Sequence, residues 1–494
     1  MKKIITIVLL LGFILAIRAQ QVYSLQDCRD LALQQNKQLS IAKLQVDVAK
    51  DLHNSAKTKY LPRVDAIAGY THFSREISIL NHEQKNGLSN LGSNLTNKVG
   101  TELNSQVSDL VEQGLLPQDA AQQLSNLFNS SSSSLTQAGN NIGQSIRDAF
   151  RTNTRNIWVG SVMVTQPIYM GGAIKATNEM ARIGKNLAQN TVESRQQDVL
   201  FSVDNAYWLA VSLKNKQRLA KDYLQLVKKL NDDVHKMIAE GVATRSDGLK
   251  VDVGVNTAEV TLTQVENGVS ITKMALCELC GLPLNKDIML KDEDSETLPT
   301  YYNAPKNLTD TAYYARAELK KLQNMIEMGR QSTRLVRSLY LPHIALTGGI
   351  MVSNPNPFNG CEQKFGGAWN IGVLLQVPIL NWGESKYRLR STRTMTSIAQ
   401  LQLDDAKNMI ALQVEQSRFK LVEAEKRLLM AQKNMTAAEE NLRCANVGFK
   451  EGVMTVTDVM TAQTAWKTAQ SQKIDAEIEV KVSQIALQKA LGVL

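Results

Sequence analysis

Two long stretches of the chain combine apolar residues at helical spacing with an absence of proline. No proline occurs in residues 168–282 or 379–494. In the first stretch the apolar residues step by three and four, as on one face of a helix: Val199, Val203, Ala206, Ala210 and Leu213. Each stretch is interrupted once, by GVATRSD at 241–247 and by GVMTVTD at 452–458, where glycine stops one helix and Ser246 or Thr457 is predicted to cap the next. The pattern predicts two helical hairpins. Each has an arm of about 68 residues, roughly 100 Å long, and an arm of about 35 residues.

Ahead of each hairpin the apolar period changes from helical to alternating. A helix of about 33 residues is predicted over 25–57 and again over 307–336, each ending at Tyr-Leu-Pro, because the residue before proline disfavours helix. Paired strands are predicted next, over 63–73 with 158–166 and over 343–352 with 369–377. A proline is expected to end each pair, and Gly172 or Gly383 to open the long helix.

These matching patterns indicate an internal duplication. Trp158, Pro167 and Gly172 recur as Trp369, Pro378 and Gly383, an offset of 211 that also relates the two glycine turns. Upstream, Tyr-Leu-Pro at 60–62 recurs at 340–342, an offset of 280. The first copy therefore has 280 minus 211, or 69, additional residues. We divide the chain into a first repeat over 20–282, a connection over 283–306 and a second repeat over 307–494.

The additional residues lie in an insertion over 71–157, between two paired strands. Ser, Asn and Gln make up 33 of its 87 residues. This composition predicts an exposed, partly disordered loop or cap that does not build a core. The residue patterns at 102–110 and 119–127 are compatible with short helices.

The beginning of the chain has the composition of a secretory signal. Lys2 and Lys3 precede 14 mostly apolar residues at 4–17, fewer than the roughly 20 that span a bilayer as a helix. We therefore expect residues 1–19 to be a signal peptide and the protein to be exported. Because no apolar run of 18 residues follows, any membrane-spanning part has to be made of strands.

Composition and motifs argue against catalysis and nucleic-acid binding. The chain is 43% hydrophobic and 21% charged, which is ordinary for a folded protein, and its net charge of +9 is too diffuse for nucleic acid. None of the five histidines forms a zinc motif, and no nucleotide-binding or hydrolase signature is present. Among the five cysteines, Cys277 and Cys280 are compatible with a disulfide, half of a metal site or, as we favour, simple packing. We predict neither an enzyme nor a cofactor or metal site.

Four strands in one chain cannot close a barrel, and in lipid an open sheet edge leaves backbone groups without partners. The strands are therefore expected to join those of other copies, and three copies supply twelve strands. Long helices without an enclosed core need neighbouring helices in the same way.

In this order, the features resemble the outer-membrane efflux proteins, the TolC-like family of channel-tunnels. The resemblance covers 25–494 except the insertion. It rests on the signal peptide, the duplication, ALQQNKQL at 32–39, both Tyr-Leu-Pro turns, QPIYMGG at 166–172 with VPILNWG at 377–383, and both glycine turns. The family's ALxxNP motif has proline where Lys37 stands.

The resemblance implies a mainly α fold with a β-barrel part. Three copies would form a twelve-stranded outer-membrane barrel continuous with a periplasmic α-helical tube, and 283–306 would join an equatorial belt. The function implied is that of a passive exit duct for efflux or type I secretion. The implied partners are a periplasmic adaptor, an inner-membrane pump and outer-membrane lipid.

The resemblance also assigns roles to residues. Those at the periplasmic entrance and adaptor docking site are Gly241, Val242, Thr244, Arg245, Asp247, Gly452, Val453, Thr455, Asp458 and Thr461. Those at the barrel-to-helix transition are Tyr60, Leu61, Pro62, Pro167, Tyr340, Leu341, Pro342 and Pro378. For Asp247 and Asp458 a purely local role is the alternative, since an acid in the first turn of a helix is favoured by the macrodipole.

A long exported helical hairpin also suits a periplasmic adaptor or a structural coiled-coil protein of the envelope. An adaptor is expected to carry one hairpin within a lipoyl-like β domain. The duplicated strand pairs favour the channel.

Overall fold

The computed structural model describes residues 22–76, 78–97, 132–151, 154–294 and 308–494. The expected signal peptide lies outside these residues, as do the helices suggested for 102–110 and 119–127. Contacts within the chain define a helical unit, formed by residues up to 57, 172–339 and 381–494, and a second unit formed by 58–171 and 340–380.

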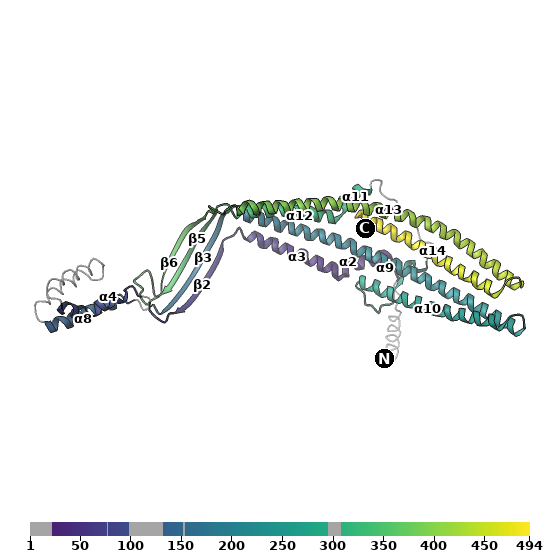
Figure 1. Ribbon diagram of the computed structural model, residues 1–494, viewed down its shortest axis with the longest axis horizontal. Coiled ribbons are helices and arrows are strands. Elements are labelled where there is room, and N and C mark those ends of the chain that lie inside the picture. Colours follow the sequence, from purple (N-terminus) through teal and green to yellow (C-terminus); the bar gives the residue numbers. More distant parts are fainter. Residues whose placement is uncertain (1–21, 77, 98–131, 152–153, 295–307) are drawn as a thin grey trace, which may run out of the picture. The chain divides into compact units, whose positions relative to one another are not determined.

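The helical unit contains the two predicted hairpins. In the first, α9 (Ala173–Ala239, 67 residues) is followed by α10 (Arg245–Leu279, 35 residues). In the second, α13 (Glu384–Lys450, 67 residues) is followed by α14 (Val456–Leu491, 36 residues). The arms of each hairpin pack side by side, and α14 also packs on α9 (Figure 1). The predicted lengths and breaks are confirmed. Gly172 and Gly383 precede the long arms with φ of 88° and 81°, in the left-handed region that glycine tolerates.

The leading helices differ from the prediction, because each is broken into two. The first copy has α2 (Leu25–Gln35) and α3 (Lys37–Thr58), and the second has α11 (Leu308–Ala315) and α12 (Ala317–Ser338). The breaks fall at Asn36 and Arg316, which are separated by the repeat offset of 280 and adopt extended ψ angles of 123° and 117°.

Both breaks are explained by contacts with the end of a short arm. Asn36 Oδ1 accepts the Leu39 N–H at 3.1 Å, which caps α3, while its Nδ2 donates to the carbonyl of Leu279 at 3.2 Å. In the second copy, Arg316 Nη1 donates to the carbonyl of Ala490 at 3.1 Å. Leu279 and Ala490 correspond at the other offset, 211, so both copies use the break to satisfy the last carbonyls of a helix. Lys37 is the first residue of α3, a position where proline and other residues are both accommodated.

Apolar contacts in the helical unit are spread along its length. One cluster includes Val203, Tyr207 and Leu276, and another includes Val414, Leu487 and Leu491. Next to the first cluster, β1 (Val22–Tyr23) pairs in parallel with β4 (Met289–Leu290), and a short 3-10 helix, η1 (Lys291–Asp294), follows. The remainder of the predicted connection, 295–306, lies outside the described residues.

The second unit is built on an antiparallel sheet. Its strands are β2 (Arg63–His72), β3 (Asn156–Met170), β5 (His343–Asn354) and β6 (Gly366–Gln376), in the order β2-β3-β5-β6. Both predicted strand pairs are confirmed. Pro167 does not end its strand, however: β3 continues to Met170 and absorbs the proline in a register shift between Pro167 and Tyr169. Such a bulge tolerates a residue that lacks an N–H. β6 ends before Pro378, as predicted.

The two faces of the sheet differ in polarity. The paired residues Ile350 with Trp369, Gly348 with Ile371 and Leu346 with Val373 place apolar side chains on one face. That face also carries Val64, Tyr70, Trp158, Val162, Val164, Val352 and Leu375. The opposite face carries mainly polar or small residues, among them Asp65, Gly69, Thr71, Ser161, Thr165, Thr347, Ser353, Asn370, Gly372 and Gln376. Six larger apolar residues also lie on it: Ile67, Ile157, Val159, Met163, Met351 and Leu374. Within this chain the apolar face is open to solvent: Trp369 is 76% exposed and Ile371 69%.

The insertion is more ordered than its composition predicts. Three helices lie in its described part: α4 (His82–Ser89), α5 (Leu91–Asn97) and α8 (Ser132–Ala149). Leu88 and Leu91 are buried where α4 and α5 pack on α8, so the expectation that the insertion builds no core is wrong. Gly92, Gly139 and Gly143 make this possible because they let backbones approach closely.

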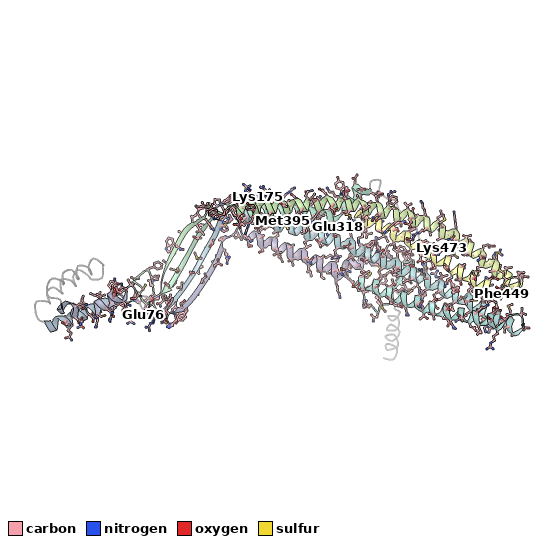
Figure 2. The ribbon with its side chains drawn as sticks, in the orientation of Figure 1. Glu76, Lys175, Glu318, Met395, Phe449 and Lys473 are labelled. Atoms are coloured by element: carbon pink, nitrogen blue, oxygen red, sulfur yellow. The ribbon has the colours of Figure 1, made fainter. Side chains whose placement is uncertain are left out.

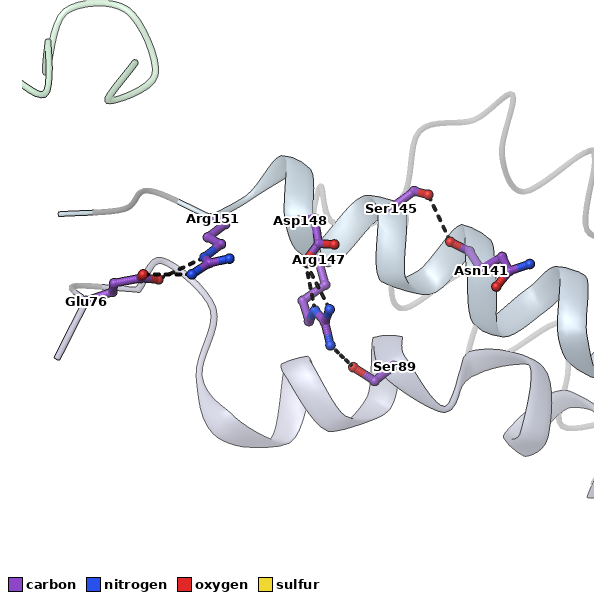
Figure 3. A network of polar contacts seen from close by, with 7 residues as sticks. All are labelled: Glu76, Ser89, Asn141, Ser145, Arg147, Asp148 and Arg151. Carbon is purple, nitrogen blue, oxygen red and sulfur yellow. Dashed lines mark hydrogen bonds and ion pairs between the residues drawn. The ribbon is translucent and has the colours of Figure 1, made fainter. Parts of the chain in front are cut away.

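Polar contacts join the helices of the insertion, as Figure 3 shows. Arg147 Nη1 donates to Ser89 Oγ at 3.0 Å, and Arg151 Nη2 donates to Glu76 Oε1 at 2.9 Å. The second contact ties the end of α8 to the segment that follows β2.

We expect Gly143→Leu to separate these helices. A Cβ at Gly143 would lie 1.8 Å from the backbone oxygen of Leu88, a clash that only backbone movement relieves. Overpacking of this kind costs about 1–3 kcal/mol or more. Hydrogen exchange should rise in 82–97 and 132–149 while the sheet stays protected. Gly87→Leu is the matched control, since a Cβ there meets nothing within 4 Å. Unchanged exchange in the Gly143 variant would contradict the packing.

Candidate functional site at the helical turns

Both hairpins turn through the same backbone motif. Gly241 and Gly452 have φ of 75° and 74°, in the left-handed region that glycine tolerates. The N–H of Val242 donates to the carbonyl of Met237 at 2.8 Å, and that of Val453 to the carbonyl of Gly448 at 2.9 Å. These are Schellman bonds, which satisfy the last carbonyls of α9 and α13.

The caps of the following helices are Thr244 and Thr455, two residues earlier than predicted. Thr244 Oγ1 accepts the N–H of Asp247, and Thr455 Oγ1 accepts that of Asp458, both at 3.2 Å. Ser246 and Thr457 do not cap because the chain leaves its extended conformation before it reaches them.

Asp247 and Asp458 complete the capping boxes, because their carboxylates accept the backbone N–H of Thr244 at 3.4 Å and of Thr455 at 2.9 Å. Their carboxylates accept the threonine hydroxyls at 2.6 Å and 2.7 Å. This hydrogen bond is the main cause that holds the pKa of each aspartate below its usual value. A hydrogen bond from Lys250 adds to the effect at Asp247. The local capping role that we considered from sequence is therefore present at both turns, and both acids stay ionised at neutral pH.

The turns present apolar side chains to their surroundings. Val242 is 71% exposed and Val453 is 80% exposed, at corresponding positions. Directly beneath them the four long helices are held together by a cluster that includes Val234, Val251 and Val459. Phe449 lies in the last turn of α13 (Figure 2), and it packs against the same cluster. Each turn thus exposes an apolar side chain next to a buried, well-packed cluster.

A groove runs alongside the turns between the two hairpins, with a volume of about 1100 Å³. Thr461 lines it, and so do small residues of α13 and α14, namely Ala437, Ala438, Thr464, Ala465 and Thr468. Thr461 Oγ1 donates to the carbonyl of Thr457, so its hydroxyl is already satisfied. Leu249, Val253 and Met460 supply the larger apolar walls. Sequence reasoning missed this groove, although small residues at 461, 464, 465 and 468 lie at helical spacing.

The remaining predicted residues lie at the ends of strands in the second unit. Tyr60, Leu61 and Pro62 lie between α3 and β2, and 340–342 lie between α12 and β5. The N–H of Leu61 donates to the carbonyl of Thr58 at 2.9 Å, and Gln166 Nε2 donates to the carbonyl of Tyr60 at 3.0 Å. The first contact closes a turn after α3, and the second ties the segment before β2 to β3.

Among the described residues, no helix combines the length and the hydrophobicity that a membrane crossing requires. No group of three or more His, Cys, Asp or Glu side chains there is arranged to hold a metal ion.

Solved structures with the same fold include outer-membrane proteins. VceC of Vibrio cholerae superposes with a TM-score of 0.68 and 15% sequence identity, covering 95% of this chain and 96% of that one. The CmeC channel of Campylobacter jejuni gives a TM-score of 0.68 and 14% identity, covering 95% and 85%. At this level of identity the likeness shows the fold.

Sequence comparison gives the family. The alkaline protease secretion protein AprF of Pseudomonas aeruginosa is 21% identical over 369 residues, which are 72% of this chain and 75% of that protein. The model of the outer membrane efflux protein family matches residues 28–282 and 308–493, which include both hairpins and all four strands of the sheet. The chain therefore belongs to the outer membrane efflux protein family.

Proposed function

We propose that this protein is an outer-membrane channel-tunnel, the passive exit duct of a tripartite efflux or type I secretion system. Its entrance would be opened by a periplasmic adaptor and an inner-membrane pump. Membership of the outer membrane efflux protein family supports this function. The polarity of the two sheet faces and the open sheet edges support insertion into the membrane. We further propose that residues 1–19 direct export and that 20–282 and 307–494 act as two repeats joined by an equatorial connection.

The sheet supports membrane insertion as part of a larger barrel. Its apolar face suits contact with lipid chains, and its polar face suits a water-filled lumen. In the described part of the chain β2 and β6 each pair on one side only, so each offers an open edge. β6 of one copy pairing with β2 of the next would satisfy both edges, and three copies would close a twelve-stranded barrel. The predicted transition residues would then mark where the barrel begins.

The experiment is to fractionate the envelope and determine the native mass of the purified protein in mild detergent. We expect the chain in the outer membrane and a mass of three copies. A soluble periplasmic monomer would instead favour the adaptor or coiled-coil alternative. A Trp369→Asp variant should reduce insertion, because it places a charge on the proposed lipid face, at a depth-dependent cost below the roughly 2–4 kcal/mol of an Arg or Lys at the bilayer midplane. Asn370→Asp, on the opposite face of the same strand, is its control.

The turns and the groove support adaptor docking at the proposed periplasmic entrance. A groove lined by alanine and threonine lets another helix approach closely, and the exposed valines lie beside it. We propose that the predicted entrance residues at 241–247 and 452–461 form this docking surface, and that a helical hairpin of the adaptor occupies the groove.

A photo-reactive amino acid at Ala465 tests this assignment in living cells. We expect a covalent adduct with an inner-membrane-anchored periplasmic protein that contains a long helical hairpin. Ala275, an exposed alanine on α10 outside the groove, is the control position. Adducts formed only between copies of this chain would contradict adaptor docking in the groove.

A further inference from the structure

Three thiols meet where the first repeat begins and ends. Cys28 lies in the first turn of α2, Cys277 in the last turn of α10, and Cys280 at the residue that ends α10. All are free thiols and buried, with exposures of 3%, 1% and 1%. They belong to one apolar cluster with Tyr207 and Leu276.

The contacts select one pair among the three. Cys280 Sγ donates to the backbone carbonyl of Cys28 at 3.5 Å, which places its thiol against α2. Cys277 Sγ is directed elsewhere, toward the carbonyl of Lys286 at 3.8 Å. Although Cys277 and Cys280 are closer in sequence, the partner that lies across the helix contact from Cys280 is Cys28.

The second repeat shows which residues fill the two corresponding positions when only packing is needed. The counterparts of Cys28 and Cys280, at offsets of 280 and 211, are Leu308 and Leu491. Both are apolar residues of the corresponding cluster. Leucine therefore suffices at this junction, and the first repeat has two apposed thiols instead.

We infer that Cys28 and Cys280 form a disulfide in the exported protein. The inference rests on the proposed export, since disulfides persist in oxidising compartments. The bond would tie the start of the first repeat to its end and close a loop over residues 28–280. It would hold α2 against α10 at the end of the hairpin away from the turns.

The chemistry is thiol–disulfide exchange with an oxidised dithiol, such as a disulfide-carrying oxidase of the compartment. The thiolate of one cysteine attacks the oxidant's disulfide and releases one of its thiols. The thiolate of the other cysteine then attacks the mixed disulfide and releases the second thiol. Cys28 and Cys280 lose two protons and two electrons in total, and the oxidant gains both.

The folded structure indicates when this happens. Hydrogen bonding to Cys280 and burial both raise the pKa of the Cys28 thiol, so little thiolate forms once α2 has docked. The exchange therefore belongs to folding after export, before the junction closes. Afterwards the bond would be shielded from reductants.

The test uses the full chain purified from the outer-membrane fraction without reductant, denatured and alkylated. We expect three alkylated cysteines, Cys277, Cys361 and Cys444, and all five only after reduction. Tryptic mapping should recover the Cys28 and Cys280 peptides as one species before reduction. Cys28→Ser and Cys280→Ser should each abolish this species, and Cys277→Ser should retain it. Cysteines introduced together by Leu308→Cys and Leu491→Cys should link in the same way.

Five alkylated cysteines in chain taken from the outer membrane would overturn the disulfide and leave the proposed function standing. A Cys277–Cys280 linkage would overturn the pairing. Absence of the chain from the envelope would overturn the proposed function, and the disulfide with it. Because the primary measurement is made on the unaltered protein, it holds even if a serine variant fails to fold.

Discussion

We expect that replacing Gly241 and Gly452 together by valine removes most of the adaptor adduct proposed for position 465, while the protein still assembles and inserts. A Cβ at either glycine would meet nothing within 4 Å, so the substitution introduces no clash with neighbouring atoms. Its cost arises from the backbone, because a β-branched residue at φ near 75° is strained by about 1–3 kcal/mol. The chain relieves that strain by opening the Schellman turn, which moves the exposed valines that we place on the docking surface.

The adduct yield and the thermal unfolding of the purified protein are measured together. Gly184→Val is the matched control, since Gly184 lies within α9 and a Cβ there also meets nothing within 4 Å. We expect the control to keep both the adduct and the unfolding temperature. A full adduct yield in the double variant would show that the turns contribute nothing to docking.

We expect the replacement of Asp204 by alanine to destabilise the helical unit by about 3–5 kcal/mol, the range for breaking a buried ion pair by removal of one partner. Asp204 is fully buried in α9, and Arg29 Nε of α2 donates to its Oδ1 at 2.7 Å. This hydrogen bond raises the pKa of Arg29. Without the carboxylate, the Arg29 side chain, which is only 24% exposed, loses its ion-pair partner, and α2 loses its polar anchor on α9.

Denaturant unfolding followed by circular dichroism measures the loss. Asp198→Ala is the control on the same helix. Asp198 contacts Lys489 at 2.9 Å, but both side chains are partly exposed, and exposed ion pairs contribute only about 0–1 kcal/mol to stability. Replacing Arg29 and Asp204 together by leucine should recover much of the stability, since no unpaired charge remains. Equal losses in the Asp204 and Asp198 variants would contradict the buried-pair argument.

The sequence by itself determined the duplicated plan of the protein. Helical spacing without proline marked both hairpins to within a residue or two, alternation marked both strand pairs, and the two repeat offsets placed the insertion. These features follow from local rules: backbone torsions exclude proline from helices, glycine tolerates positive φ, and side-chain periods are 3.6 and 2. The resemblance to the family could be recognised from the sequence for the same reason, because local residue patterns mark the order of its helices, strands and turns.

Only the tertiary structure decided the points where distant segments meet. The leading helices break at Asn36 and Arg316 because carbonyls more than 170 residues away need donors there. The insertion forms packed helices because glycines on α5 and α8 let backbones touch, a contact that composition does not reveal. The groove beside the turns arises between separate hairpins, and Cys280 has Cys28 as a neighbour across 252 residues. Local sequence patterns determine the side-chain period of each helix and strand. The packing of the whole chain determines which faces of these elements meet.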